Sequence, residues 1–368
     1  RRLSLIGDIM SDYKAPIAIH PGETLKDILE ETGLSQAQLS GRTGLHVKTI
    51  NEIIKGKNPI TSETALKLSI VFGMSEGFWN NLQRNYEETV ARIALDKEIE
   101  KDLKIAEKFT CYNELVKYKY IEKTTELKER ARSLLSFLGL TSFRYLERNY
   151  TVAFRKSSVG KVSKENLIAW LRCGELAALN TETKAFKKDR LKKILPEIRK
   201  LNLLKPGEYS LALKSLLAEC GVAIAYVPYL KNTYVNGATR WLNPSKVLVQ
   251  LTPRNKSEDI LWFTLFHELC HVLKHGRKEG YISFWEDNYL NKNFMELEDE
   301  ADLFASEILI PTKEWNTFYG NSSLTHSEII NFAKKIGVKP GIVAGRLSRE
   351  TGKWARFSRL REKVEVGI

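Results

Sequence analysis

An apolar segment that carries two histidines four residues apart is the feature that most limits how this 368-residue chain can fold. Residues 260–273 are mostly apolar over more than three helical turns, which predicts a buried helix. His267 and His271 lie in this segment within an H-E-x-x-H motif. Positions i and i+4 share one face of a helix, so both imidazoles can reach the same metal ion. Glu268 follows about 100° further round the helix, where it can contact a water molecule on that ion.

A second segment supplies the acidic side chains that such a site needs. Glu298 and Asp302 stand at i and i+4 in another stretch of helical pattern. A zinc peptidase site requires a third protein ligand and an open coordination position. Glu298 would complete a two-histidine, one-glutamate set for Zn²⁺, and Asp302 would accept the N–H of a ligating imidazole. The alternative is a pair of core histidines beside a surface glutamate. We interpret His275, which continues the i+4 series, as a helix-end residue.

The N-terminal part, residues 15–88, contains closely spaced helix start and stop signals. Five helices are expected, with starts or caps at Pro21, Ser35, His46, Ser62 and Ser75. Ser35 and Gln38 have the spacing of a capping box. The second and third helices, separated by a turn at Gly44, have the spacing of a helix-turn-helix motif. The alternative is a helical module that makes only protein contacts.

In a helix-turn-helix motif the start of the third helix enters the major groove of DNA. Lys48 can reach guanine, Thr49 a base edge or a phosphate, and Val47 a thymine methyl group. Side chains suited to the DNA surface around these are Gln36, His46, Lys55 and Lys57. The formal net charge of +13 favours a polyanion partner, although many basic proteins bind none.

The N-terminal motifs resemble those of HigA-type antitoxins of the XRE helix-turn-helix group over residues 16–88. The resemblance is carried by residues 20–23, 33–36, 49–54, 56–57, 59–66 and 78–83. It implies a homodimer that represses its own operon at a double-stranded operator and neutralises a RelE/HigB-like toxin. Residues 46–48 depart from the polar residues usual in that family, which leaves the operator sequence open.

The C-terminal motifs resemble the ImmA/IrrE metallopeptidases, a gluzincin-like group, over residues 165–350. The matching segments are 237–241, 262–271, 298–305, 309–311 and 341–347. The resemblance implies that zinc is held by His267, His271 and Glu298, that Glu268 is the general base, and that the substrate is a DNA-binding repressor. Cys270 replaces the usual glycine, either as a packing residue or as a thiol that regulates the site. Tyr281, Tyr289 and His326 are candidates for stabilising the oxyanion.

Strand patterns are confined to a short region of the second half. Residues 222–227, 238–242 and 247–251 read as strands, with turn signals at Asn236-Gly237 and Asn243-Pro244. The strand from residue 236 is either an edge strand that pairs with an extended substrate or an ordinary core strand. The expected fold class is mainly α, with an N-terminal all-α domain, a helical linker and an α+β zincin-like domain with a small sheet.

We expect a lead at 1–14, a helix-turn-helix domain at 15–88, a helical linker at 89–150, a peptidase domain at 151–350 and a tail at 351–368. The four cysteines form no C-x-x-C pair, and neither a signal peptide nor a membrane-spanning run is apparent, which favours the cytoplasm. Three functions are compatible with these features: a repressor and antitoxin with an active peptidase, a DNA- and toxin-binding protein with a non-catalytic zincin domain, and a metabolic regulator that senses a small ligand.

Overall fold

The computed structural model describes residues 16–150, 162–252, 257–276, 281–284, 292–321 and 323–364. The chain forms two compact units, Arg1–Asp102 and Leu103–Ile368. The expected lead at 1–14 and the last four residues of the expected tail lie outside the described residues. The stretch expected to be a helical linker, 89–150, is divided between the two units, because its first part continues the last helix of unit 1.

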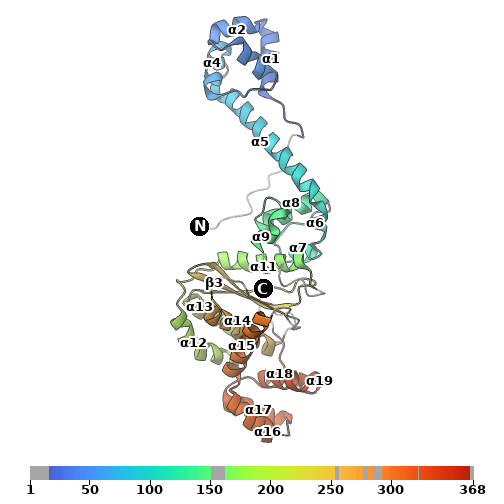
Figure 1. Cartoon of the computed structure of the whole chain (residues 1–368), viewed down its shortest axis with the longest axis vertical. Coiled ribbons are helices and arrows are strands. Elements are labelled where there is room, and N and C mark those ends of the chain that lie inside the picture. Colours follow the sequence, from blue (N-terminus) through green and yellow to red (C-terminus); the bar gives the residue numbers. More distant parts are fainter. Residues whose placement is uncertain are drawn as a thin grey trace. The chain divides into compact units, whose positions relative to one another are not determined.

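The described part of unit 1, from residue 16 on, contains five helices (Figure 1): α1 (Pro21–Thr32), α2 (Gln36–Thr43), α3 (Val47–Ile54), α4 (Ser62–Phe72) and α5 (Glu76–Lys101). The capping box at the start of α2 is confirmed, since the Ser35 hydroxyl accepts from the Gln38 backbone and the Gln38 side chain accepts from the Ser35 backbone. Ser75 caps α5 as expected. The prediction for α4 was wrong by one residue, because Thr61 is the cap and Ser62 is the first helical residue.

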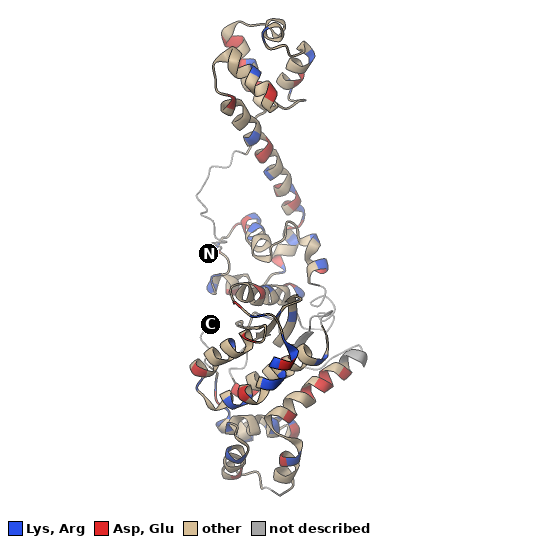
Figure 2. Ribbon diagram, turned by 90° about the vertical axis from the view of Figure 1, so that its left-hand side faces the viewer, with Lys and Arg blue, Asp and Glu red and all other residues tan. Residues whose placement is uncertain are grey.

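The apolar faces of these five helices together form the core of unit 1. Its fully buried side chains include Leu25, Leu39, Ile50, Leu68 and Trp79. A Cβ on Gly22 would lie 1.9 Å from the Ile53 carbonyl oxygen, so α1 can approach α3 only with glycine at that position. Beyond this core, α5 carries basic and acidic residues interspersed along its length, as Figure 2 shows, which is typical of a solvated helix.

Unit 2 is built around a four-stranded sheet in the order β1-β3-β2-β4. Its strands are β1 (Val222–Tyr226), β2 (Val235–Asn243), β3 (Lys246–Leu251) and β4 (Tyr281–Phe284). β1 pairs with β3 in parallel, whereas β2 is antiparallel to both β3 and β4. Helix α11 (Lys164–Leu179) covers one face, and α13 (Pro206–Ala218) and α14 (Glu258–Lys274) cover the other (Figure 1).

The structure decides between the two alternatives for β2 and corrects one turn prediction. The strand is an inner strand and not an edge strand, because β4, which the sequence pattern did not indicate, pairs with its outer side. Asn236-Gly237 is not a turn but lies inside β2, where the pairing with β4 shifts register. The turn signal at Asn243-Pro244 is confirmed, since it separates β2 from β3.

Helices complete unit 2 on both sides of the sheet. Before α11 come α6 (Leu103–Glu107), α7 (Tyr112–Lys117), α8 (Leu127–Leu138) and α9 (Leu146–Asn149), and α12 (Lys188–Lys200) precedes α13. After β4 come α15 (Lys292–Leu309), α16 (Thr312–Asn321), α17 (His326–Ile336), α18 (Pro340–Thr351) and α19 (Trp354–Phe357). The expected fold class, mainly helical with a small sheet in the C-terminal part, is confirmed. Over the described residues, every helix is too short or too polar to cross a membrane.

Candidate metal centre

The central helix α14 is buried along nearly its whole length. Its apolar side chains, among them Trp262, Leu265 and Leu269, pack between β1, β3 and the C-terminal helices in one large core. The apolar run therefore forms the expected helix. Because this packing surrounds the helix, His267 and His271 are also buried, with side chains 6% and 0% exposed. Helix α15 packs against α14 and brings Glu298 to the same place.

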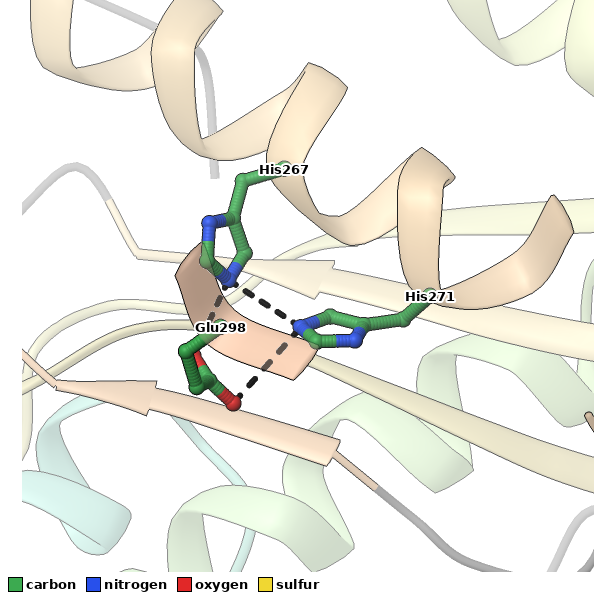
Figure 3. A group of neighbouring side chains, drawn as sticks. All are labelled: His267, His271 and Glu298. Atoms are coloured by element: carbon green, nitrogen blue, oxygen red, sulfur yellow. Dashed lines mark hydrogen bonds and ion pairs between the residues drawn. The ribbon is translucent and has the colours of Figure 1, made fainter. Parts of the chain in front are cut away.

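The structure brings three donor atoms together (Figure 3): His267 Nε2, His271 Nε2 and the Glu298 carboxylate. The two Nε2 atoms lie 3.0 Å apart. Glu298 Oε2 lies 3.2 Å from His267 Nε2, and Glu298 Oε1 lies 3.7 Å from His271 Nε2. Bonds of about 2.0–2.1 Å to a tetrahedral ion separate two ligand atoms by about 3.3–3.4 Å. These three groups, called the donor triangle below, therefore lie at separations that suit one bound metal ion.

His267 is oriented through its other ring nitrogen. Its Nδ1 lies 2.8 Å from Asp302 Oδ1, and Asp302 Oδ2 accepts from Arg349 Nη2 at 2.6 Å. Burial lowers the pKa of His267, but the hydrogen bonds with Asp302 and Glu298 have a larger, opposite effect. The net result is a pKa raised to about 10. The carboxylates thus favour a cation at this ring. With the proton on Nδ1, the Nε2 lone pair faces the other two donors.

His271 is held by a different partner. Its Nδ1 lies 2.7 Å from Nδ1 of His275, the C-cap residue of α14. His275 Nε2 in turn lies 2.9 Å from Glu300 Oε2. His275 is therefore a helix-end residue, as expected, but it also contacts a candidate metal ligand. The i+4 spacing after His271 was the available signal for this contact.

Glu268 is fully buried and points toward the sheet. The Thr239 hydroxyl donates to Glu268 Oε2 at 2.7 Å. A Cβ on Gly237 would lie 2.7 Å from Glu268 Oε1 and 2.6 Å from Thr264 Cγ2, so β2 can pass this close to α14 only with glycine there. Sequence reasoning did not single out Thr239 or Gly237 as site residues, because their contact with α14 depends on strand order.

A cavity of about 700 Å³ lies next to the donor triangle, between α14, α15 and α18. Its walls include Phe263, His267, Glu298, Asp302 and Arg349. Two of the three donor residues therefore line a space large enough for part of a peptide.

Cys270 is not one of the three residues that form the donor triangle. Its side chain is buried, and the thiol lies 4.0 Å from the backbone oxygen of Glu300. Burial raises the pKa of the Cys270 thiol to about 12, which keeps it protonated at neutral pH. These observations favour the packing role over the regulatory one. Of the oxyanion candidates, Tyr289 lies outside the described residues, Tyr281 begins β4, and His326 is an exposed residue at the start of α17.

The candidate DNA-contacting residues lie around α2 and α3. His46, Val47, Lys48, Lys55 and Lys57 are exposed, and Gln36 and Thr49 are half-buried. The Lys48 side chain is 85% exposed, with Nζ 3.9 Å from Glu52 Oε1.

The Gln36 amide also has a structural contact. Its oxygen accepts from Asn51 Nδ2 at 3.2 Å, which links α2 to α3. Gln36 therefore stabilises the motif as well as being available at its surface.

Comparisons with known proteins identify related domains for both the N-terminal and the C-terminal part of the chain. Residues 25–79 match the helix-turn-helix family. The virulence-associated protein I of Dichelobacter nodosus is 39% identical over 75 residues, which cover 20% of this chain and 69% of that protein. The chain belongs to the helix-turn-helix family. An uncharacterised helix-turn-helix transcriptional regulator of Escherichia coli K12, YddM, is 30% identical over 76 residues, covering 21% of this chain and 81% of that protein.

Residues 240–348 match the IrrE N-terminal-like domain of peptidase family M78. Among solved structures, the Pseudomonas aeruginosa antitoxin HigA with the higBA promoter is 36% identical, covering 23% of this chain and 95% of that chain, with a TM-score of 0.22. The chain thus combines an XRE-type helix-turn-helix unit with an M78 peptidase-family domain, as the motifs predicted.

Proposed function

We propose that this chain is a cytoplasmic transcriptional repressor of the antitoxin type whose M78 domain is a zinc-dependent endopeptidase. Its substrate would be a repressor, including another copy of this chain. The observation that carries the proposal is the convergence of His267, His271 and Glu298 within 4.8 Å of one another in the buried interior of unit 2. Two neutral imidazoles and a carboxylate leave three electron pairs directed at one point, an arrangement that a divalent cation stabilises.

The chemistry follows from the surroundings of these residues. Zinc bound by His267, His271 and Glu298 would polarise the scissile carbonyl and lower the pKa of a water molecule. Glu268 accepts the proton of the attacking water and passes it to the leaving amine. Thr239 donates to one carboxylate oxygen of Glu268 and thereby fixes the rotation of that carboxylate. Asp302 fixes the proton of His267 on Nδ1 and thereby keeps Nε2 available as a donor.

For the N-terminal unit we propose that α3 enters the major groove of a double-stranded operator. Val47 and Lys48 stand exposed at the start of this helix, where base edges are read. Lys55 and Lys57 follow its end and suit phosphate contacts. A homodimer would match the two-fold symmetry of such an operator. A RelE/HigB-like toxin is the second partner that we propose.

The first experiment measures zinc by elemental analysis in wild type and in His267→Ala, both purified without added metal. We expect about one zinc per wild-type chain and its loss in the variant. Cleavage is then tested with a tagged Glu268→Gln chain as substrate and untagged wild type as enzyme, with Glu268→Gln as the enzyme control. Fragments of the tagged chain that appear only with wild-type enzyme support the peptidase. Zinc binding without cleavage of this chain or of a partner repressor favours the non-catalytic zincin domain.

A further inference from the structure

His275 occupies a position that neither zinc ligation nor the general base accounts for. It ends α14 one turn after His271, and its side chain is only 2% exposed. Both of its ring nitrogens are engaged: Nδ1 lies 2.7 Å from His271 Nδ1, and Nε2 lies 2.9 Å from Glu300 Oε2. Glu300 is held from outside by Lys274 Nζ at 2.7 Å.

The proton positions along this chain of contacts follow from metal binding. A neutral imidazole that ligates through Nε2 carries its proton on Nδ1. His271 Nδ1 is therefore a donor, and His275 Nδ1 must accept. The proton of a neutral His275 then lies on Nε2, where it is donated to the Glu300 carboxylate. With His271 ligating through Nε2 and a neutral His275, each hydrogen bond in the series has one donor and one acceptor.

The same geometry excludes His275 as a third histidine ligand. His275 contacts the ring nitrogen of His271 that points away from Glu298, and both of its own nitrogens are used. The two candidate zinc-binding imidazoles thus differ in support. Asp302 contacts His267 directly, whereas a second imidazole stands between His271 and its carboxylate.

We infer that His275 is a positioning residue of the metal centre. It accepts the Nδ1 proton of His271, fixes the rotation of that ring and sets Nε2 for coordination, while Glu300 fixes the tautomer of His275. This inference rests on the proposed zinc site, because it assigns a role toward a metal that His271 would bind.

Two substitutions of His275 test its contact with His271 separately from its contact with Glu300. In His275→Asn the side-chain oxygen takes the place of Nδ1 and can still accept from His271, but the side chain is too short to reach Glu300. In His275→Gln the amide takes the place of Nε2 and can still contact Glu300, but no acceptor faces His271. Lys335→Gln is the control, since it removes an exposed lysine whose ion-pair partner is Glu314 and which takes no part in the His271–His275–Glu300 series.

The experiment uses the full chain and measures zinc affinity by competition with a chromophoric chelator. Loss of a hydrogen-bond partner of a ligating histidine typically weakens metal affinity 10–100-fold. We expect that loss in His275→Gln, an affinity within about threefold of wild type in His275→Asn, and no change in Lys335→Gln. Substitution with Co²⁺ gives a second readout, because its visible absorption reports coordination geometry. The spectrum should change in His275→Gln and be retained in His275→Asn.

Equal weakening in His275→Asn and His275→Gln would show that the residue only packs the helix end, and would overturn the inference. Wild-type affinity in both variants would overturn it as well. Failure of the wild-type chain to bind zinc would instead remove the proposed metal site, and with it this role. The wild-type measurement therefore distinguishes the two failures.

Discussion

Replacement of Asn166 by leucine tests whether residues 103–150 are a fixed part of the peptidase unit. Asn166 lies in α11, is fully buried and joins three segments through its side chain. Its oxygen accepts from the Cys111 backbone N–H at 3.1 Å. Its amide nitrogen donates to Thr110 Oγ1 and to the Lys231 backbone oxygen, both at 2.7 Å. The stretch before α7, helix α11 and the loop after β1 are held by this one side chain.

The size of the effect follows from the groups left behind. Leucine has a similar volume, so the cavity contribution is small. The N–H of Cys111 and the carbonyl of Lys231 each lose the partner that Asn166 supplies, at a cost of about 1–3 kcal/mol per buried group. The Thr110 hydroxyl can rotate to another partner. We therefore expect Asn166→Leu to lower the free energy of unfolding of unit 2 by about 2–6 kcal/mol.

Urea denaturation followed by tryptophan fluorescence measures this change, because Trp170 is buried on the same helix. With a urea m-value of about 3 kcal/mol/M, a loss of about 3 kcal/mol moves the midpoint by about 1 M. Asn180→Ala is the matched control: Asn180 is the exposed C-cap of α11, and its side chain donates to the Leu176 oxygen at 3.2 Å. It should change stability by less than about 0.5 kcal/mol. An Asn166→Leu midpoint equal to that of the control would refute the reasoning.

Three further outcomes are expected. Thr239→Val should reduce the turnover of the proposed peptidase about 10–100-fold with zinc content unchanged, because a hydrogen bond to a charged group contributes about 1.5–3 kcal/mol. Thr239→Ser keeps the hydroxyl and should retain activity. An unaffected Thr239→Val variant would contradict the role assigned to the hydroxyl. Ser35→Ala should destabilise unit 1 by about 1 kcal/mol in thermal unfolding, and no change would mean that the capping box contributes little. Lys48→Gln should weaken operator binding. If Lys48 neutralises a phosphate, the slope of log K against log salt becomes less negative by about 0.9. An unchanged slope with an altered base preference would instead indicate that Lys48 contacts a base.

The parts of the site that were predictable from sequence are those set by one helix at a time. The spacing of His267 and His271 fixes their common face whatever α14 packs against, and the same holds for Glu298 and Asp302 on α15. Thr239 and Gly237 escaped prediction because their contact with Glu268 depends on the order of strands in the sheet. No local pattern encodes the placement of β2 opposite α14.

Asn236-Gly237 shows why a turn signal can mislead. The pair is typical of hairpin turns because glycine tolerates a positive φ. Here Gly237 lies in a strand, and what the position requires is the absence of a Cβ beside Glu268. Glycine permits both a positive φ and a close approach without a Cβ, so the residue alone does not show whether a turn or a tightly packed strand is present. The fourth strand, β4, is only four residues long and carries too little alternation to be recognised.

The different supports of the two histidines also bear on how a substrate reaches the metal centre. The Asp302 side chain, which holds His267, is 31% exposed and lines the cavity together with Arg349. His275, which holds His271, is 2% exposed, and neither His271 nor His275 lines the cavity. A peptide that enters this cavity therefore meets the His267 side of the donor triangle first. On the other side of the donor triangle, the His271 imidazole is buried and contacts His275 away from the cavity.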